Sequence, residues 1–356
     1  MTEPTSRRLV LARLALLGAA VALAPAAWSG EPAPPPSAAA GKLEKITVSV
    51  PGPRNISYLP VDLIPKIGAD RAEGVEMHLL HTGGGGVALK QMATRNSDFA
   101  VAGVPAHQSL RAHGEGVVTL MPVNDLPLFI LMVRSELKDQ VKRIADLKGR
   151  VIGVNTSSMT SKTTSQQLAE LLLSSDGVPP NEARILPAGQ SWEEQSSQIM
   201  SGRVDAIMGD EPYASRLLEQ GRVFFLASLS DPDIGRRVPG AGFLHAALAA
   251  RPDTVTQHPE KVRRMTDMLR RSLGYIASHA AEEVVAALGV EDPEEKRSLV
   301  YSLNQYPRAF SKDGRFSTQQ LQETDAFFHG ASPGDPQAQA LKLESMVDDR
   351  WAGRKE

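Results

Sequence analysis

Residues 82–103 read TGGGGVALKQMATRNSDFAVAG, and this stretch decides the fold class. The apolar segment Val75–Leu80 before it has the composition of a strand, and the run of four glycines forms a turn. Val87–Thr94 is then expected to be a short helix and Asp98–Gly103 the next strand. A strand, a helix and a second strand in this order predict two parallel strands with a helix packed across them.

Strand-like and helix-like segments alternate along the chain on both sides of this stretch. Further strands are expected at residues 46–50, 117–121, 128–134, 151–155, 183–186, 204–208, 223–226 and 243–249, and helices at 59–69, 259–278, 280–288, 293–303 and 317–328. The alternation predicts an α/β fold with mostly parallel sheets and helices on both faces. A chain of 356 residues suits two lobes better than one core. The C-terminal third is predicted to be helical packing with little site chemistry.

The N-terminal segment has the pattern of an export signal. Three arginines precede an apolar stretch at residues 14–24, and small residues follow it. This predicts a signal peptide over residues 1–29 and a protein that works in the periplasm. The segment SRRLVL at residues 6–11 resembles a twin-arginine signal, and an ordinary secretory signal is the alternative. Residues 30–41, GEPAPPPSAAAG, are expected to be a linker.

Composition excludes several classes of function. The formal net charge is -2, and removal of residues 1–29, with three Arg and one Glu, leaves roughly -4. Without a basic surplus, nucleic acid is not an expected partner. The chain contains no cysteine, which excludes disulfides, cysteine nucleophiles, thiolate metal sites and a lipid-modified cysteine.

The glycine turn allows three interpretations. Gly83-x-Gly85-x-x-Ala88 has the spacing of a dinucleotide fingerprint, and the N–H groups of a helix start attract anions. A dinucleotide site also needs an acid at the end of the next strand, but that strand ends in AGVP at residues 102–105. The fingerprint should also follow the first strand, whereas this turn follows the second. The sequence therefore favours a turn that approaches another ligand, or a turn without a ligand.

Three motifs occur in the same order as in one known family. The glycine turn, its helix and the segment SDFA resemble a "glycine loop, helix, V-D-F-A strand" run. IADLKGRVIGV at residues 144–154 is similar to a DLKGK-x-IGV segment, and GRVDA at 202–206 followed by Glu211-Pro212 is similar to a G-x-V-D-A … E-P segment. Over roughly residues 45–280 the chain resembles the nitrate/sulfonate/taurine and thiamine-pyrimidine (NMT1/THI5-like) type of ABC transporter solute-binding protein.

The resemblance implies a type II periplasmic-binding fold with two lobes joined by crossing strands near residues 128–134 and 240–249. Lobe one would comprise residues 42–133 plus 242–356, and lobe two residues 134–241. It also implies a monomeric receptor that captures a small molecule by hinge closure and delivers it to the permease and ATPase subunits of an ABC importer. A related eukaryotic branch relies on a cysteine-rich iron-binding motif, and that enzyme chemistry cannot apply to a chain without cysteine.

Candidate ligand contacts follow from the rule that ligands of open α/β sheets bind beyond the carboxyl ends of the strands. Two helix starts, near Val87 and Ser161, are expected to face each other and to offer N–H groups and hydroxyls to a polar head group. The candidates are Arg54, Tyr58, Thr82, Gly83, Gly84, Gly85, Gly103, Val104, Asn155, Ser157, Ser158, Thr160, Trp192, Asp210 and Glu211.

Several candidates have a structural alternative. The hydroxyl residues at 157–160 are also suited to capping the next helix, and Asp210 to capping a helix that begins near Pro212. In the functional interpretation, Asp210 or Glu211 accepts a hydrogen bond from a ligand amine. The aromatic candidates either stack on a ligand ring or pack in the core, and the arginine either binds an anion or lies free on the surface.

The sequence contains no pattern that requires catalysis, a metal or a cofactor. His78 and His81 point to opposite faces of a strand, and we find no hydrolase elbow, Walker loop or zinc signature. Two other classes stay open, an exported oxidoreductase that uses the glycine turn for a cofactor and an extracytoplasmic sensor module. Nitrate, sulfonates, aromatic carboxylates and pyrimidines are all compatible with the expected cleft.

Overall fold

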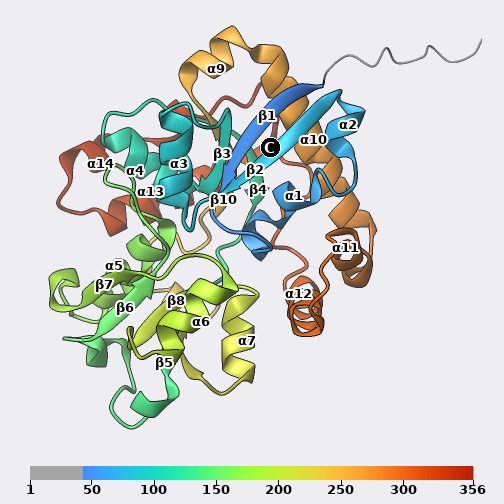
Figure 1. Ribbon diagram of the computed structural model, residues 1–356. Helices are drawn as coiled ribbons and strands as arrows, with labels where there is room; N and C mark the ends of the chain where they lie inside the picture. The colour runs from blue at the N-terminus through green and yellow to red at the C-terminus, as the bar shows by residue number, and fades with distance from the viewer. Residues whose placement is uncertain (1–42, 356) are drawn as a thin grey trace, which may run out of the picture. The chain divides into compact units, whose positions relative to one another are not determined.

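Two five-stranded sheets form the framework of residues 43–355, which the computed structural model describes (Figure 1). The first sheet has the order β2-β1-β3-β10-β4, and the second has the order β7-β6-β8-β5-β9. The first contains β1 (Glu44–Val50), β2 (Val75–His81), β3 (Phe99–Gly103), β4 (Val118–Asn124) and β10 (Ala246–Ala250). The second contains β5 (Phe129–Arg134), β6 (Val151–Val154), β7 (Arg184–Pro187), β8 (Ala206–Asp210) and β9 (Val223–Ser228). A short parallel pair joins β11 (Phe316–Ser317) to β12 (Arg354–Lys355).

Both sheets share one pattern of strand directions. In the first sheet β1 is parallel to β2 and β3, and β10 is antiparallel to both of its neighbours. In the second sheet β6 is parallel to β7 and β8, and β5 is antiparallel to β8 and β9. The central strands β3 and β10 are buried along their whole length, which fits their apolar sequences FAVAG and AALAA. The predicted α/β class is therefore confirmed.

Helices cover both faces of the first sheet, with α3 on one side and α1 and α10 on the other (Figure 1). Proline opens α9, α10 and α12, where its fixed φ suits the first turn and its missing N–H is not needed. The helices are α1 (Leu59–Leu63), α2 (Ala69–Ala72), α3 (Gly85–Ala93), α4 (Val104–Ala112), α5 (Thr164–Ser175), α6 (Trp192–Met200), α7 (Tyr213–Glu219), α8 (Pro232–Gly235), α9 (Pro252–Gln257), α10 (Pro259–Ser278), α11 (Ala281–Ala287), α12 (Pro293–Gln305), α13 (Thr318–Ala331) and α14 (Pro336–Ala340), with short 3-10 turns η1 (Ile56–Tyr58), η2 (Ser135–Leu137), η3 (Ile144–Leu147), η4 (Pro180–Glu182) and η5 (Leu343–Met346).

Two helical segments differ from the sequence prediction. The single helix expected at residues 59–69 is divided into α1 and α2, because Pro65 cannot donate a backbone hydrogen bond inside a helix. The helix α4 begins directly after β3, in a segment to which the sequence analysis assigned no element. Pro105 lies in its first turn and is tolerated there.

The chain passes between the sheets twice. It leaves the first sheet after β4 and enters the second at β5, so this passage spans residues 125–128. It returns between the end of β9 and the start of β10, within residues 229–245. The expected lobe boundary between residues 133 and 134 falls inside β5, whose hydrogen-bonded neighbours both belong to the second sheet.

The hydrophobic core follows the two sheets but not the order of the chain. One cluster surrounds the first sheet, and two further clusters lie on the second. Phe327 of α13 belongs to a cluster of the second sheet, where its ring stacks on Phe243 with 4.1 Å between the ring centres. The C-terminal helix α13 therefore contributes to the core around the second sheet, and it contacts α5 as well as α4.

The predicted signal peptide at residues 1–29 and the linker at 30–41 lie outside the described residues. From residue 43 to residue 355, no helix combines the length and the apolar character needed to cross a membrane.

Replacing Phe327 by Ala should lower the free energy of unfolding by about 3–5 kcal/mol, because it removes a buried ring and leaves a cavity. Phe225→Ala is the matched control, since Phe225 is 47% exposed and exposed substitutions usually change stability by less than about 0.5 kcal/mol. Urea denaturation followed by circular dichroism measures both variants. Equal effects in the two variants would contradict the packing of α13 described above.

Candidate ligand-binding site

Polar side chains from both sheets meet at the edge where the parallel strands end. Asn55 lies beyond the end of β1, Asn155 follows β6, Gln190 lies after β7 and Asp210 is the last residue of β8. All four are buried, with at most 3% exposure. This is the position in which open α/β sheets bind their ligands. We define the polar cluster as Asn55, Tyr58, Asn155, Gln190, Asp210 and His245.

Asp210 is the centre of the hydrogen bonding in the polar cluster. Its Oδ2 accepts hydrogen bonds from Asn155 Nδ2 at 3.0 Å and from Gln190 Nε2 at 2.6 Å. Asn55 lies close enough to lower the pKa of Asp210, although its Nδ2 makes no hydrogen bond of normal geometry. The three amides lower the pKa of Asp210 because they stabilise its charged form. Burial raises the pKa by more than the amides lower it, so the pKa of Asp210 is about 7.

Aromatic rings form another side of the polar cluster. His245 lies just before β10. The centre of its ring is 5.0 Å from the ring centre of Phe129, in an edge-on arrangement, and 6.2 Å from the ring centre of Tyr58. Burial lowers the pKa of His245 to about 3. Burial, with a smaller contribution from the charge of Asp210, raises the pKa of Tyr58 far above its ordinary value. Both rings are therefore uncharged near neutral pH.

Several buried polar atoms of this region have no hydrogen-bond partner among the described residues. An added Cβ at Gly103 would lie 2.0 Å from Thr164 Oγ1, which places that hydroxyl at the end of β3. Buried polar groups are nearly always paired, so unpaired groups contributed by both sheets indicate a site for a polar molecule. The unpaired atoms are Asn55 Nδ2, Asn124 Nδ2, Thr164 Oγ1, Gln190 Oε1 and both ring nitrogens of His245.

The glycine turn packs directly against the turn that follows β6. The carbonyl oxygen of Gly83 accepts a hydrogen bond from the Thr156 N–H at 3.2 Å. An added Cβ at Gly84 would lie 2.1 Å from the carbonyl oxygen of Thr156, and one at Gly86 would lie 2.4 Å from that of Ser161. Only glycine permits two backbones to approach this closely.

The remaining candidates in these two turns make local contacts. The Thr82 hydroxyl donates to two backbone carbonyls, and Gly85 begins α3 and packs against β3. The Ser157 hydroxyl donates to a side chain of α5, whereas the hydroxyls of Ser158 and Thr160 are buried without a described partner. Protein backbone covers the start of α3, where a dinucleotide would place its pyrophosphate. The dinucleotide interpretation is not supported.

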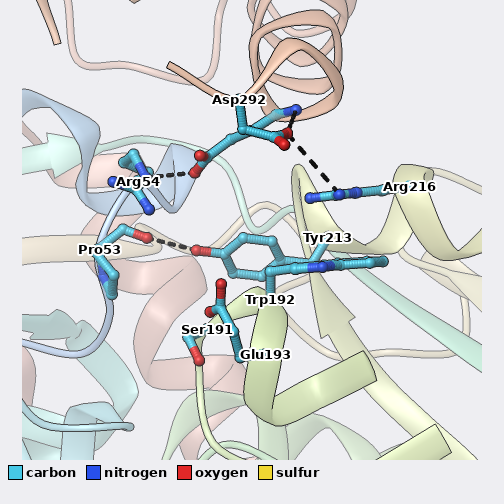
Figure 2. Close-up of a pocket in the computed structure, with 9 residues that line it drawn as sticks. Pro53, Arg54, Ser191, Trp192, Glu193, Tyr213, Arg216 and Asp292 are labelled. Atoms are coloured by element: carbon cyan, nitrogen blue, oxygen red, sulfur yellow. Dashed lines mark hydrogen bonds and ion pairs between the residues drawn. The ribbon is translucent and has the colours of Figure 1, made fainter. Parts of the chain in front are cut away.

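Arg54 and Trp192 are not part of the polar cluster and line a cavity that has a volume of about 380 Å³ (Figure 2). The guanidinium of Arg216 lies 3.9 Å from the centre of the Trp192 ring and bonds to Glu294 at 2.8 Å. Arg54 forms an ion pair with Glu295. Both arginines are thus paired with acids at the start of α12. The C-terminal third therefore takes part in this region, contrary to the sequence prediction.

Glu211 connects the two sheets through its backbone. Its carbonyl oxygen accepts a hydrogen bond from the Ile56 N–H at 3.0 Å. Its carboxylate accepts bonds from the Ser215 hydroxyl at 2.8 Å and from the Tyr306 hydroxyl at 3.3 Å, and burial raises its pKa. The side chain of Glu211 is therefore engaged with α7 and with the residue that follows α12, whereas Asp210 faces the polar cluster.

The fifteen candidates named from the sequence omit Asn55, Asn124, Thr164, Gln190 and His245. The rule that ligands bind beyond the carboxyl ends of strands selects only residues that follow a strand. Because β10 is antiparallel to its neighbours, it is the start of β10 that lies at this edge of the sheet. His245 lies at that start, and its carbonyl accepts the N–H of the candidate Val104 at 2.8 Å. A single histidine before the apolar run AALAA was the one available signal.

The two histidines of β2 have separate partners. His78 Nε2 lies 3.4 Å from Glu76, and His81 Nε2 lies 3.3 Å from Asp62. Nowhere in residues 43–355 do three or more His, Asp or Glu side chains come together in a way that could hold a metal ion.

The two sheets with a polar cluster between them define the α/β architecture of the periplasmic binding proteins. A family model described as NMT1/THI5 like matches residues 71–283, more than half of the chain. The chain therefore belongs to the NMT1/THI5-like family, and the resemblance stated from its motifs is confirmed. No curated protein sequence matches it.

Solved structures with the same fold are similar to nearly the whole described chain. The alkanesulfonate-binding protein SsuA from Xanthomonas axonopodis pv. citri has a TM-score of 0.68 at 16% identity, covering 87% of this chain and 100% of its own. The aliphatic sulphonate binding protein SsuA from Escherichia coli has a TM-score of 0.60 at 15% identity, covering 86% of this chain and 98% of its own. The nitrate-binding protein NrtA from Synechocystis PCC 6803 has a TM-score of 0.64 at 12% identity, covering 86% of each chain. At these identities the likeness establishes the fold.

Replacing Gly84 by Ala should separate the glycine turn from Thr156, because the new Cβ would overlap a backbone carbonyl. We expect at least about tenfold faster hydrogen exchange at the Thr156 amide, corresponding to a loss of about 1.4 kcal/mol of local protection. Gly274→Ala in α10 is the control, since nothing lies within 4 Å of its added Cβ. Unchanged exchange at Thr156 in the Gly84 variant would show that the two turns do not depend on this contact.

Proposed function

We propose that this chain is the periplasmic solute-binding component of an ABC importer and that it binds a small molecule between its two sheets. The observation that carries the proposal is the polar cluster, in which both sheets contribute buried donors and acceptors that have no hydrogen-bond partner within residues 43–355. Membership of the NMT1/THI5-like family supports the same role, as do structural neighbours named as alkanesulfonate-binding and nitrate-binding proteins.

The proposed mechanism is capture by closure of two lobes, one built on the first sheet (β1–β4 and β10) and one built on the second (β5–β9). A ligand that contacts both sheets stabilises the closed form, because an open form makes only part of these contacts. The contact between the glycine turn and the Thr156 turn would belong to the closed form, as would the ion pair between Arg216 and Glu294 of α12. The permease and ATPase subunits would recognise this form, and the receptor would act as a monomer.

Export and ligand class complete the proposal. The predicted signal peptide at residues 1–29 would direct the chain to the periplasm, by the twin-arginine or the general secretory route. The named ligands of the structural neighbours make an anion one candidate, and a polar heterocycle is the other. The proposal assigns the chain no catalytic residues and no cofactor.

Distance measurements between spin labels test the closure directly. The chain has no cysteine, so Lys66→Cys and Arg203→Cys, at exposed positions near opposite sheets, provide two unique labelling sites. Protein purified without denaturation is compared with protein that is unfolded, dialysed and refolded. We expect a narrow distance distribution with a bound small molecule in native mass spectrometry, and a broader distribution after refolding that narrows again when the released molecule is added.

A label pair on one sheet is the control for this experiment. Lys45→Cys with Lys66→Cys places both labels beside the first sheet, and their distance should not change. If native mass spectrometry finds no small molecule and the Lys66–Arg203 distance is the same in all samples, the chain is not a receptor that closes on a ligand.

A further inference from the structure

The polar cluster contains a buried carboxylate and no buried cation. No lysine or arginine is among the buried residues of the part of the chain that the structure describes, whereas Asp210 and Glu211 are both 1% exposed. The arginines of the adjoining cavity, Arg54 and Arg216, are already paired with acids of α12. An anion bound in the polar cluster would therefore meet negative charge without a compensating positive side chain.

Helix starts are the other protein feature that attracts anions, and the starts of α3, α4, α5 and α6 are each covered or partly capped by protein groups. Residues 157–161 cover the first turn of α3, and the first N–H of α4, that of Val104, donates to the carbonyl of His245. In α5 and α6 the N-cap side chains of Thr163 and Ser191 accept backbone N–H groups. Together with the absence of a buried cation among the described residues, this disfavours nitrate, sulfonates and carboxylates as ligands.

We propose that the ligand is a small nitrogen compound, cationic or neutral, that donates N–H hydrogen bonds to Asp210 and Gln190, an inference that rests on the proposed function. Both protein amides donate to Oδ2 of Asp210, whereas Oδ1 receives no hydrogen bond of normal geometry from the described residues, although the Asn55 amide lies near this carboxyl group. Gln190 Oε1 is a second buried acceptor without a described partner. An amine or an amidine carries at least two N–H groups close together. It could therefore donate to Asp210 Oδ1 and Gln190 Oε1 at the same time, because these two residues are hydrogen-bonded to each other.

The charge state of Asp210 discriminates between the two ligand classes. An ionised Asp210 attracts a cation, whereas a protonated Asp210 could donate its proton to an anion. With a pKa of about 7, raised by burial, Asp210 ionises as the pH rises through neutrality. Affinity for a cation should therefore rise from about pH 5 to about pH 8, and affinity for an anion that needs the proton should fall.

Other ionisable groups near Asp210 do not reproduce this pH dependence. The charged or titratable neighbours are Glu211, Tyr58 and Tyr213, and both tyrosines stay neutral because burial raises their pKa values. His245 also stays neutral, since burial lowers its pKa to about 3. The pKa of Glu211 is raised as well, but its carboxylate is bonded to the Ser215 hydroxyl and the Tyr306 hydroxyl and faces away from the cluster.

Calorimetric titration with benzamidine, benzamide, benzoate, nitrate and ethanesulfonate tests the inference. The first three share one shape and differ in charge, so their order of affinity reports the charge preference of the site. At about pH 8 we expect benzamidine to bind at least about tenfold more tightly than benzoate, a difference of about 1.4 kcal/mol. Its affinity should decrease as the pH is lowered to about 5. Tighter binding of benzoate, nitrate or ethanesulfonate than of benzamidine would overturn the inference.

Two neighbouring substitutions connect the effect to one carboxyl group. Asp210→Asn should weaken benzamidine binding at least about tenfold and remove its pH dependence, because the amide has no charge to titrate. Glu211→Gln is the comparison variant: it should keep the pH dependence but move it to lower pH, because the Glu211 charge contributes to the raised pKa of Asp210. If Asp210→Asn fails to fold, the pH dependence of benzamidine binding to the unmodified protein still tests the inference, which requires weaker binding at about pH 5 than at about pH 8. Equal effects of the two substitutions would overturn the assignment to Asp210.

The outcomes separate this inference from the proposed function. If an anion binds and the spin-label distances narrow, the chain is a receptor and the ligand class is wrong. If none of the five compounds binds, the mass of the small molecule that accompanies the natively purified protein identifies the class of ligand. A nitrogen base supports the inference, an anion overturns it, and the absence of any small molecule overturns the proposed function as well.

Discussion

The burial of the Asp210 carboxylate is the constraint on which the arrangement between the two sheets depends. A carboxyl group removed from water is stable only with hydrogen-bond donors around it, or with a proton. Asn155 and Gln190, which follow strands of the second sheet, donate to one of its oxygens, and the amide of Asn55, beyond β1 of the first sheet, lies near the same carboxyl group. The protein thus satisfies one carboxylate oxygen, and a bound molecule that donates hydrogen bonds would satisfy the other.

A second constraint acts at the glycine turn, where backbone meets backbone. The Gly83 carbonyl, the Thr156 N–H and the space that Gly84 and Gly86 leave open allow the turns of the two sheets to approach without intervening side chains. The ion pair between Arg216 of α7 and Glu294 of α12 connects the same two parts of the chain from another direction. A ligand in the polar cluster would therefore be bound behind contacts that already exclude water, which strengthens each hydrogen bond that it makes.

The sequence predicts what depends on local pattern and fails where distant segments determine the geometry. The apolar strands, the long helix over residues 259–278 and the family motifs follow from short stretches of the chain. The rule of strand ends selects Tyr58, Asn155 and Asp210, which the structure brings together. It cannot select His245, because the direction of β10 depends on pairing with strands far away in the chain. The sequence also cannot tell whether the glycine turn approaches a ligand or another backbone.

A crystal structure of the protein, purified without denaturation, tests the central claim most directly. The account predicts electron density for a small molecule enclosed between Tyr58, His245 and Asp210, with a donor atom of the ligand within about 3 Å of Asp210 Oδ1. Density for a ligand in the cavity lined by Arg54 and Trp192 instead, with the polar cluster paired only to itself, would contradict the account.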